Sequence, residues 1–310
     1  MSKLNVSVAP HIHSGASTQR IMMDVCIAML PALLAGAYLF GLQALLVVAV
    51  CIAATVVGEF LFNLIAKKKQ TIGDFSAVVT GMLLGLNLST NVPLWQCAMG
   101  GLFAILLVKC LFGGLGQNIV NPAIAARVFM LLAFSAVAGG ADPIRSIGGV
   151  ELATGATPLA AETHPSLLTM LVGAHGGAIG ETCAIALLLG YVYLVARKVI
   201  QWYVPLTFVA TVFGLYLVFT GNVQEALFQV LAGGLLLGAI FMATDYVTTP
   251  ITGRGRVFFC IGAGIITFAI RYWGSYPEGV SIAILCMNLL VPMLERLAKK
   301  TPLKGDNFHG

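Results

Sequence analysis

The sequence predicts an all-α polytopic membrane protein with about ten transmembrane helices, because of its composition, its apolar segments and their arrangement. Hydrophobic residues make up 59% of the 310 residues, charged residues make up 9%, and the mean hydropathy is +0.95. Soluble globular domains do not have such a composition. A helical span needs about 20 apolar residues, so the chain has room for roughly ten spans and one longer loop. A separate soluble domain is excluded, and residues 1–310 are expected to form a single membrane domain.

Ten apolar segments follow one another along the chain, five on each side of a long polar break. The first five are Ile21–Phe40, Ala44–Ala66, Ser76–Leu88, Leu94–Phe112 and Ile119–Val137. The second five are Ala178–Ala196, Tyr203–Phe219, Phe228–Thr244, Val257–Tyr272 and Val280–Leu294. The break, residues 139–177, is the longest in the sequence. Residues 1–20 are polar and contain no apolar region, so a cleaved signal peptide is not expected. Residues 298–310 form a tail.

The third and eighth segments are short, rich in glycine and similar to each other. Gly81 and Gly234 are each followed by a second glycine four residues later, then by a polar stretch and a proline. Five helices per repeat is an odd number, so residues 21–138 and 178–297 are expected to form two repeats with opposite orientations in the membrane. Short broken helices in matching positions indicate a binding site near the middle of the bilayer, where the repeats meet.

The positive charges predict the orientation of the chain. Most of them lie on the side of the N-terminus: Lys3, Arg20, Lys67, Lys68, Lys69, Arg197, Lys198, Arg254, Arg256, Arg296, Lys299, Lys300 and Lys304. The opposite side holds only Arg145 and Arg271. Because cytoplasmic loops are enriched in Lys and Arg, both termini are expected in the cytoplasm of a prokaryote and residues 139–177 outside its cytoplasmic (inner) membrane. The net charge of +5 is explained by the positive charges of the cytoplasmic loops, so no nucleic-acid partner is inferred.

The long loop contains a short motif with hydroxyl groups and little bulk. It consists of Glu151 followed, three residues later, by Thr154, Gly155, Ala156 and Thr157. A hydroxyl oxygen accepts a phosphoester bond, and small residues before it let an enzyme and a phosphate approach the backbone closely. The alternative is an ordinary turn.

This motif resembles the flavinylation motif of the NqrB/RnfD family, the membrane subunits of respiratory Rnf and Na⁺-NQR complexes. The family pattern is Asp, two variable residues, Ser or Thr, Gly, Ala and Thr, and here Glu151 replaces the Asp. The resemblance implies that Thr157 receives covalent FMN from a flavin transferase. It extends over nearly the whole chain, and the length favours the RnfD type. It also implies a fold like that of urea transporters.

A glycine-rich stretch before the fifth segment contains Asn118 and Asn121, followed by Pro122. Three residues apart at a helix start, the two amides would lie on one side, where they could meet the edge of a flavin ring. The alternative is helix capping, because Asn is a favoured N-cap and Pro suits the first turn. The same family has a similar segment, which helps to hold a second, noncovalent flavin, FMN or riboflavin.

Three carboxylates lie in or next to apolar segments. Asp245 follows the eighth segment in a Met-Ala-Thr-Asp stretch that is similar to one in the family. An acidic residue near bilayer depth indicates function, so cofactor support or ion passage is one interpretation and a hydrated helix end is the other. For Asp24 and Glu59 a neutral or paired structural role is expected.

No metal site and no catalytic residue of this chain's own is predicted. The seven cysteines, scattered through apolar segments without metal-ligand spacing, are interpreted as small core residues. His11 and His13 are expected to be solvated or to face a partner, and His164 and His175 to lie in loops.

These observations together predict a flavin-carrying electron-transfer subunit. The resemblance implies an Rnf-type enzyme complex in which electron transfer between ferredoxin and NAD drives Na⁺ or H⁺ across the membrane. Its partners would be the other Rnf subunits, the transferase and membrane lipid. Two alternatives are a stand-alone solute channel or transporter with the same repeats, and a scaffold that holds neighbouring subunits.

Overall fold

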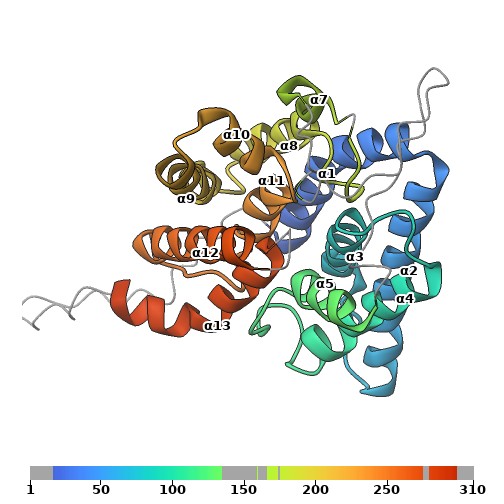
Figure 1. The fold of residues 1–310 in the computed structure, drawn as a ribbon. Coiled ribbons are helices and arrows are strands. Elements are labelled where there is room, and N and C mark those ends of the chain that lie inside the picture. Colours follow the sequence, from blue (N-terminus) through green and yellow to red (C-terminus); the bar gives the residue numbers. More distant parts are fainter. Residues whose placement is uncertain (1–16, 135–158, 160–165, 174, 275–278, 299–310) are drawn as a thin grey trace, which may run out of the picture.

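The computed structural model describes residues 17–134, 159, 166–173, 175–274 and 279–298, and it is helical without strands in those residues (Figure 1). The first half contains α1 (Thr18–Phe40), α2 (Leu42–Ile65), the short 3₁₀ turn η1 (Ile72–Asp74), α3 (Ser76–Leu86), α4 (Leu94–Leu102), its π-helical continuation η2 (Phe103–Cys110) and α5 (Pro122–Ala133). The second half contains α7 (Leu167–Val172), α8 (Ala184–Ala196), α9 (Tyr203–Thr220), α10 (Val223–Leu231), α11 (Leu235–Leu237), its π-helical continuation η4 (Gly238–Met242), α12 (Gly253–Trp273) and α13 (Val280–Ala298). Each of the ten predicted apolar segments holds a helix.

The helices have the length and surface of membrane spans. Within the described residues, α1, α2, α9, α12 and α13 are each long and apolar enough to cross a membrane, and α10 with α11 and η4 is a bent pair with the composition of a broken span or a re-entrant loop. Large apolar side chains cover the outside of these helices, including Ile65 and Val218, which are 81% and 80% exposed. In water such a surface would be very unfavourable. The chain is therefore a multi-pass membrane protein, as its composition predicted.

Several helices begin at a polar cap that the sequence supplies. The Ser17 hydroxyl accepts a hydrogen bond from the Arg20 amide at the start of α1, and the Thr252 hydroxyl accepts one from the Gly255 amide at the start of α12. These side chains satisfy backbone donors that have no partner within the helix.

The two halves pack their helices in the same order. In the first half α2 packs on α3 and α4, and α5 packs on α3, α4 and η2; in the second half α9 packs on α10 and α12, and α13 packs on α12 and η4. Between the halves, the first helices of each, α1 and α8, pack together, and so do the last, α5 and α13 (Figure 1). Several corresponding pairs of helices are therefore in contact in both halves.

The eighth segment is a broken helix, as its glycines indicated. The axis turns by 64° between α10 and α11. Gly233 and Gly234 have φ angles of 67° and 68°, which side chains other than glycine rarely adopt. The guanidinium of Arg271, in the last turn of α12, donates to the carbonyls of Gln229 (2.5 Å), Ala232 (3.0 Å) and Gly233 (2.9 Å). This cation therefore binds the carbonyl end of α10, where the helix leaves acceptors without intrahelical donors.

Two predicted segment starts differ from the observed helix starts by five residues or more. The eighth helix begins at Val223, five residues before the predicted Phe228, because Asn222 caps it and a polar first turn precedes the apolar run. The sixth begins at Ala184 instead of Ala178. Residues 178–183 form turns whose amides at 179 and 180 donate to the carbonyls of residues 88 and 86, just after and at the end of α3.

Candidate functional site

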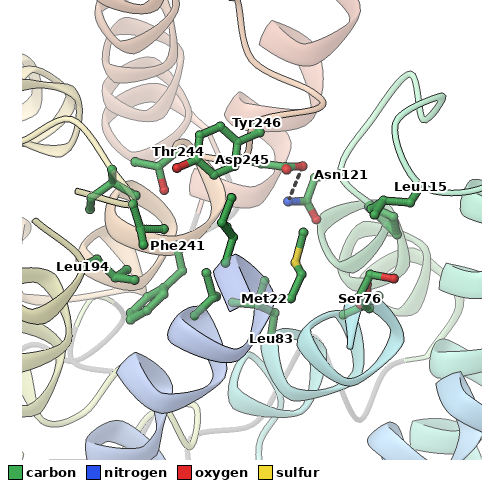
Figure 2. A pocket seen from close by; sticks show the side chains of 16 residues that line it. Met22, Ser76, Leu83, Leu115, Asn121, Leu194, Phe241, Thr244, Asp245 and Tyr246 are labelled. Atoms are coloured by element: carbon green, nitrogen blue, oxygen red, sulfur yellow. Dashed lines mark hydrogen bonds between the residues drawn. The ribbon is translucent and has the colours of Figure 1, made fainter. Parts of the chain in front are cut away.

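A pocket lies where α1, α3 and α5 begin and where α8 and η4 end (Figure 2). Its cavity volume is about 80 Å³. One part of the wall is apolar, and the other carries amide, hydroxyl and carboxylate groups. The lining residues are Ile21, Met22, Val25, Ser76, Thr80, Leu83, Leu115, Asn121, Pro122, Leu194, Val199, Ile200, Phe241, Thr244, Asp245 and Tyr246. The pocket thus brings together two of the predicted site residues, Asn121 and Asp245, from opposite halves of the chain.

Asn121 is both a helix cap and a pocket residue. Its side-chain oxygen accepts hydrogen bonds from the amides of Ala123 (3.0 Å) and Ile124 (3.4 Å), and Pro122 is the first residue of α5. The capping interpretation is therefore confirmed for this residue. Its side-chain nitrogen is turned to the other half of the molecule and donates to Asp245 Oδ2 at 3.4 Å (Figure 2).

Asp245 is held by donors on its own turn as well as by Asn121. Thr248 Oγ1 donates to Asp245 Oδ2 at 2.8 Å, and the Val247 amide donates to Oδ1 at 3.2 Å. Burial raises the pKa of the Asp245 carboxyl above its ordinary value, and the hydrogen bonds from Thr248 and Val247 oppose this rise. The N-terminus of α5, with its partial positive charge, lies beside the same carboxyl. Asp245 is thus a partly buried, oriented acceptor at the pocket.

Asn288 of α13, which was not singled out in the sequence, links the backbones of Asn121 and Thr248. With its amide in the orientation that satisfies both groups, its nitrogen donates to the Thr248 carbonyl (3.0 Å) and its oxygen accepts from the Asn121 amide (3.1 Å). It is 1% exposed. A buried asparagine inside an apolar helix needs polar partners, and that requirement was the available signal.

Asn118 does not share a helix face with Asn121, so that prediction was wrong. The helix begins at Pro122, and Asn118 lies in the preceding glycine-rich turn. Its side chain is buried, does not line the pocket, and its Oδ1 has no hydrogen-bond partner in the described chain. The i, i+3 argument fails because the Asn121 cap excludes the earlier residues from the helix.

The flavinylation motif lies outside the described residues. This applies to Glu151, Thr154, Gly155, Ala156 and Thr157. The nearest described residue in the chain is Leu159, which packs with Met170, Phe228 and Ala232 in a small apolar cluster at the end of α10. Leu159, two residues after the last residue of the motif, therefore packs against the broken helix.

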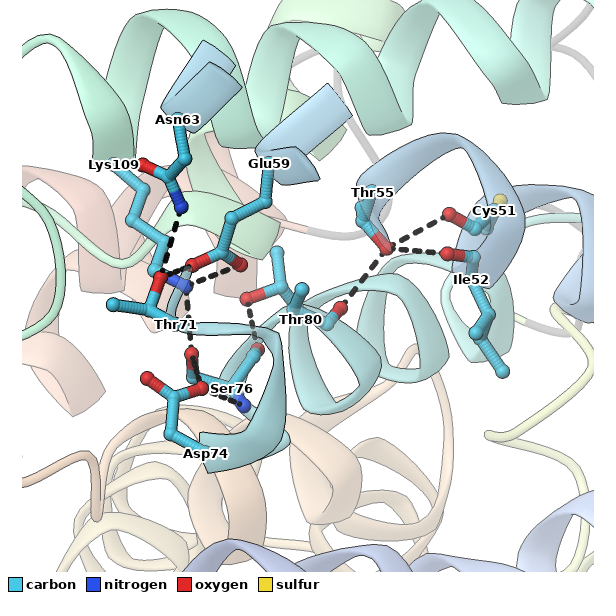
Figure 3. A network of polar contacts seen from close by, with 11 residues as sticks. Cys51, Ile52, Thr55, Glu59, Asn63, Thr71, Asp74, Ser76, Thr80 and Lys109 are labelled. Carbon is cyan, nitrogen blue, oxygen red and sulfur yellow. Dashed lines mark hydrogen bonds and ion pairs between the residues drawn. The ribbon is translucent and has the colours of Figure 1, made fainter. Parts of the chain in front are cut away.

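A second polar group lies between α2, η2 and the start of α3 (Figure 3). Lys109 Nζ and Glu59 Oε2 form an ion pair at 2.8 Å, with both side chains 2% exposed. The expected paired role of Glu59 is confirmed. Asp24 is also paired, with Arg197 at 3.2 Å and with the Tyr193 hydroxyl at 2.9 Å.

Cysteine side chains come together in the described residues only as a contact between Cys51 and Cys97, where Cys51 Sγ lies 3.8 Å from the Cys97 carbonyl oxygen. The seven cysteines are free thiols, and four of them are buried in the core. His175 lies in a loop, and its Nδ1 is 3.0 Å from the Gly176 carbonyl oxygen. Burial lowers the pKa of His175, so its ring is neutral at physiological pH. Three or more ligands that could hold a metal do not come together in these residues. His11, His13 and His164 lie outside them.

The fold and the pocket define a multi-pass membrane protein whose two halves meet at a buried polar site. A family model described as the NQR2, RnfD, RnfE family matches residues 5–304, and the chain belongs to that family. It is 43% identical to the D subunit of the Na⁺-translocating ferredoxin:NAD⁺ oxidoreductase complex of Acetobacterium woodii, over 97% of this chain and 96% of the relative.

Two further relatives match over similar lengths. The chain is 38% identical to the D subunit of the proton-translocating ferredoxin:NAD⁺ oxidoreductase complex of Clostridium ljungdahlii, over 95% of this chain and 94% of that protein. It is 36% identical to the D subunit of the ion-translocating oxidoreductase complex of Stutzerimonas stutzeri, with the same coverage. The resemblance found in the motifs is therefore confirmed for the family.

Proposed function

We propose that this chain is the RnfD-type membrane subunit of an ion-translocating oxidoreductase complex and that it transfers electrons through bound flavins. The complex would couple electron transfer between ferredoxin and NAD to the movement of Na⁺ or H⁺. The observation that carries the proposal is the 43% identity over 97% of the chain to a relative with that name. The names of two relatives specify different ions, so the choice of ion stays open.

For the architecture, we propose ten spans in two inverted repeats, as in urea transporters. The corresponding pairs of packed helices in the two halves support it. A further support is that Lys109 and Arg271, the last-turn cations of η2 and α12, each contact the broken or shortened helix of their own half. With the cationic ends in the cytoplasm, both termini and the mouth of the pocket lie on the inner side of the cytoplasmic membrane.

For the covalent cofactor, Thr157 is the FMN acceptor, with Glu151, Thr154, Gly155 and Ala156 as the motif that the transferase recognises. The support is the motif, together with the attachment of Leu159 next to the break after α10. Two residues of chain span at most about 7 Å. The proposal therefore has the flavin phosphate close to the break after α10.

For the noncovalent flavin, the residues of the pocket fit a flat ring that is apolar on its faces and polar along one edge. Met22, Leu83 and Phe241 supply apolar contacts, while Asn121 and Asp245 present a donor and an acceptor. Asn118 would act only through the conformation of its turn. A bound flavin supplies the redox chemistry, and the protein holds its edge and excludes water from its faces.

The covalent cofactor is tested by removing the acceptor hydroxyl. Thr157→Ala should abolish the flavin fluorescence of the denatured chain in a gel, whereas Thr154→Ser, the matched control, should retain it. The reason is that the phosphoester needs the oxygen of residue 157. A fluorescent Thr157→Ala chain would contradict the assignment, and a parent chain without any flavin would favour a solute channel.

A further inference from the structure

Ser76 belongs both to the wall of the pocket and to the polar chain that contains the Glu59–Lys109 ion pair (Figures 2 and 3). We propose that this ion pair compensates charge in the pocket. When the occupant gains an electron, Glu59 takes up a proton, and the positive charge of Lys109 then acts on the reduced occupant. This inference rests on the proposal that a noncovalent flavin occupies the pocket.

The geometry connects the pocket wall to the protein surface. Lys109 Nζ donates to Glu59 Oε2 (2.8 Å) and to Ser76 Oγ (2.6 Å), and Ser76 Oγ donates to Asp74 Oδ1 (2.5 Å). On the other side of the pair, Thr71 Oγ1 donates to Glu59 Oε1 (2.5 Å). Lys109 and Glu59 are both buried, whereas Thr71 is exposed. One side of the ion pair thus reaches the pocket through a single hydroxyl, and the other reaches solvent through another.

The ion pair is poised to respond because its two charges cancel while the pocket is neutral. An anion in the pocket attracts the ammonium group of Lys109, and the burial of Lys109 and Ser76 limits the screening of this attraction by solvent. Lys109 then neutralises the negative charge of Glu59 less completely. A buried carboxylate whose charge is not fully neutralised is energetically unfavourable. Proton uptake by Glu59 removes that cost.

The other titratable or charged groups of this cluster respond less. They are Asp74 from η1, Cys110 from η2 and Lys68 from the turn after α2. Asp74 is half-exposed and accepts two hydrogen bonds from Ser76, through the amide and the hydroxyl, so its charge is already stabilised. Lys68 is exposed. A thiol such as that of Cys110 carries no charge at neutral pH. Glu59 is therefore the group in this cluster whose charge depends most on Lys109.

The step balances as one electron and one proton. A one-electron carrier of the complex would supply one electron to the occupant. A hydronium ion in cytoplasmic water gives up a proton, so one O–H bond breaks there and one O–H bond forms on the Glu59 carboxylate. When the next carrier oxidises the occupant, the proton leaves Glu59.

The test is a redox titration of the noncovalent flavin in the purified complex, by electrode and mediators, at several pH values around neutrality. For a one-electron step, one coupled proton moves the midpoint potential by about 59 mV per pH unit. In Glu59→Gln, the midpoint potential should depend less on pH, because the contribution of this proton is lost. Asp24→Asn is the matched control, because Asp24 is a paired carboxylate at the same end of the molecule that contacts Tyr193 and Arg197 instead of Ser76.

A second readout follows the carboxyl itself. The reduced-minus-oxidised infrared spectrum should contain the carbonyl band of a protonated carboxyl in the parent and in Asp24→Asn, but not in Glu59→Gln. If Glu59→Gln does not assemble, the double variant Glu59→Gln, Lys109→Met removes both charges without leaving one unpaired. It should show the same loss in both measurements.

The outcomes separate this inference from the proposed function. Acid extraction first measures the noncovalent flavin in every variant. Full flavin content with an unchanged pH dependence and an unchanged carboxyl band in the Glu59 variants would overturn the charge-compensation proposal alone. A parent complex without extractable flavin would overturn both proposals.

Discussion

At the residue scale, the site depends on side chains that each have two roles. Asn121 caps α5 with its oxygen and contacts Asp245 with its nitrogen. Asn288 then joins the backbone of Asn121 to that of Thr248, which donates to Asp245. The position of the carboxyl is therefore determined jointly by the last helices of the two halves. A substitution that preserves one role of Asn121 and removes the other can separate stability from cofactor binding.

Asn121→Asp is such a substitution. Aspartate caps a helix as well as asparagine does, so the thermal stability of the purified complex should change little. The new carboxylate would lie about where the amide nitrogen is, 3.4 Å from Asp245 Oδ2, and two close carboxylates repel. We expect the acid-extractable flavin to fall several-fold.

Asn121→Ala provides the comparison for that variant. It should lose the cap, at a cost of about 1 kcal/mol, as well as the flavin. Asn118→Leu should retain more flavin than either, because Asn118 does not line the pocket. Normal flavin content in Asn121→Asp would show that Asn121 is only a cap.

At the element scale, the break in the eighth helix requires specific residues that stabilise it. Two consecutive glycines with positive φ turn the chain between α10 and α11, and Arg271 binds the carbonyls that the break exposes. The glycines satisfy the backbone conformation, and the arginine satisfies the acceptors.

Gly234→Ala should therefore destabilise the complex. A non-glycine residue at φ 68° costs about 1–2 kcal/mol, and the new Cβ would lie 3.0 Å from Glu181 Oε2. The matched control is Gly214→Ala in the middle of α9, where a Cβ meets nothing within 4 Å and alanine favours the helix. Thermal unfolding in detergent should show a lower midpoint for Gly234→Ala and an equal or higher one for Gly214→Ala. Equal midpoints for both variants would mean that the break does not need glycine.

Local features of the elements were predictable from the sequence, and long-range contacts were not. Apolar runs predicted a helix in each of the ten apolar segments, and glycines predicted the break in the eighth, because both depend on neighbouring residues. The third segment, with the same glycine spacing, was also expected to be broken, but it holds one continuous helix, α3. The partner of Glu59 is 50 residues away, and that of Asn121 is 124 residues away. The sequence showed that a carboxylate in an apolar span needs a partner, but it did not show which one. The position of Asn118 was predicted wrongly because the fifth helix begins only after the Asn121 cap, at Pro122, and Asn118 therefore lies outside the helix.

At the scale of the whole molecule, the proposed function depends on which side of the membrane each end of the pocket faces. The pocket and the Glu59–Lys109 pair lie where α1 and α3 begin. The cations of the chain gather at the same end, for instance at Arg197 and Lys198 after α8. The proposed topology makes this end cytoplasmic and the flavinylated loop extracytoplasmic.

Two single-cysteine variants in a cysteine-free chain test this orientation. An impermeant maleimide applied to whole cells should label a cysteine at Ala161 and should leave one at Lys68 unlabelled until the cells are opened. The physical reason is that cytoplasmic loops retain positive charge, and Lys67, Lys68 and Lys69 form a cluster in one turn. Labelling of position 68 in intact cells, with position 161 protected, would reverse the topology.

The most direct test of the proposed function is the intact mass of the chain, purified under denaturing conditions from cells that contain the flavin transferase. If the chain is a covalent flavoprotein, its mass should equal that of the sequence plus one FMN less one water, because a phosphoester between the Thr157 hydroxyl and the FMN phosphate forms with a net loss of one water. Peptide mapping should assign the increment to the peptide that contains Thr157. A chain with the bare sequence mass, purified from such cells, would contradict the central claim.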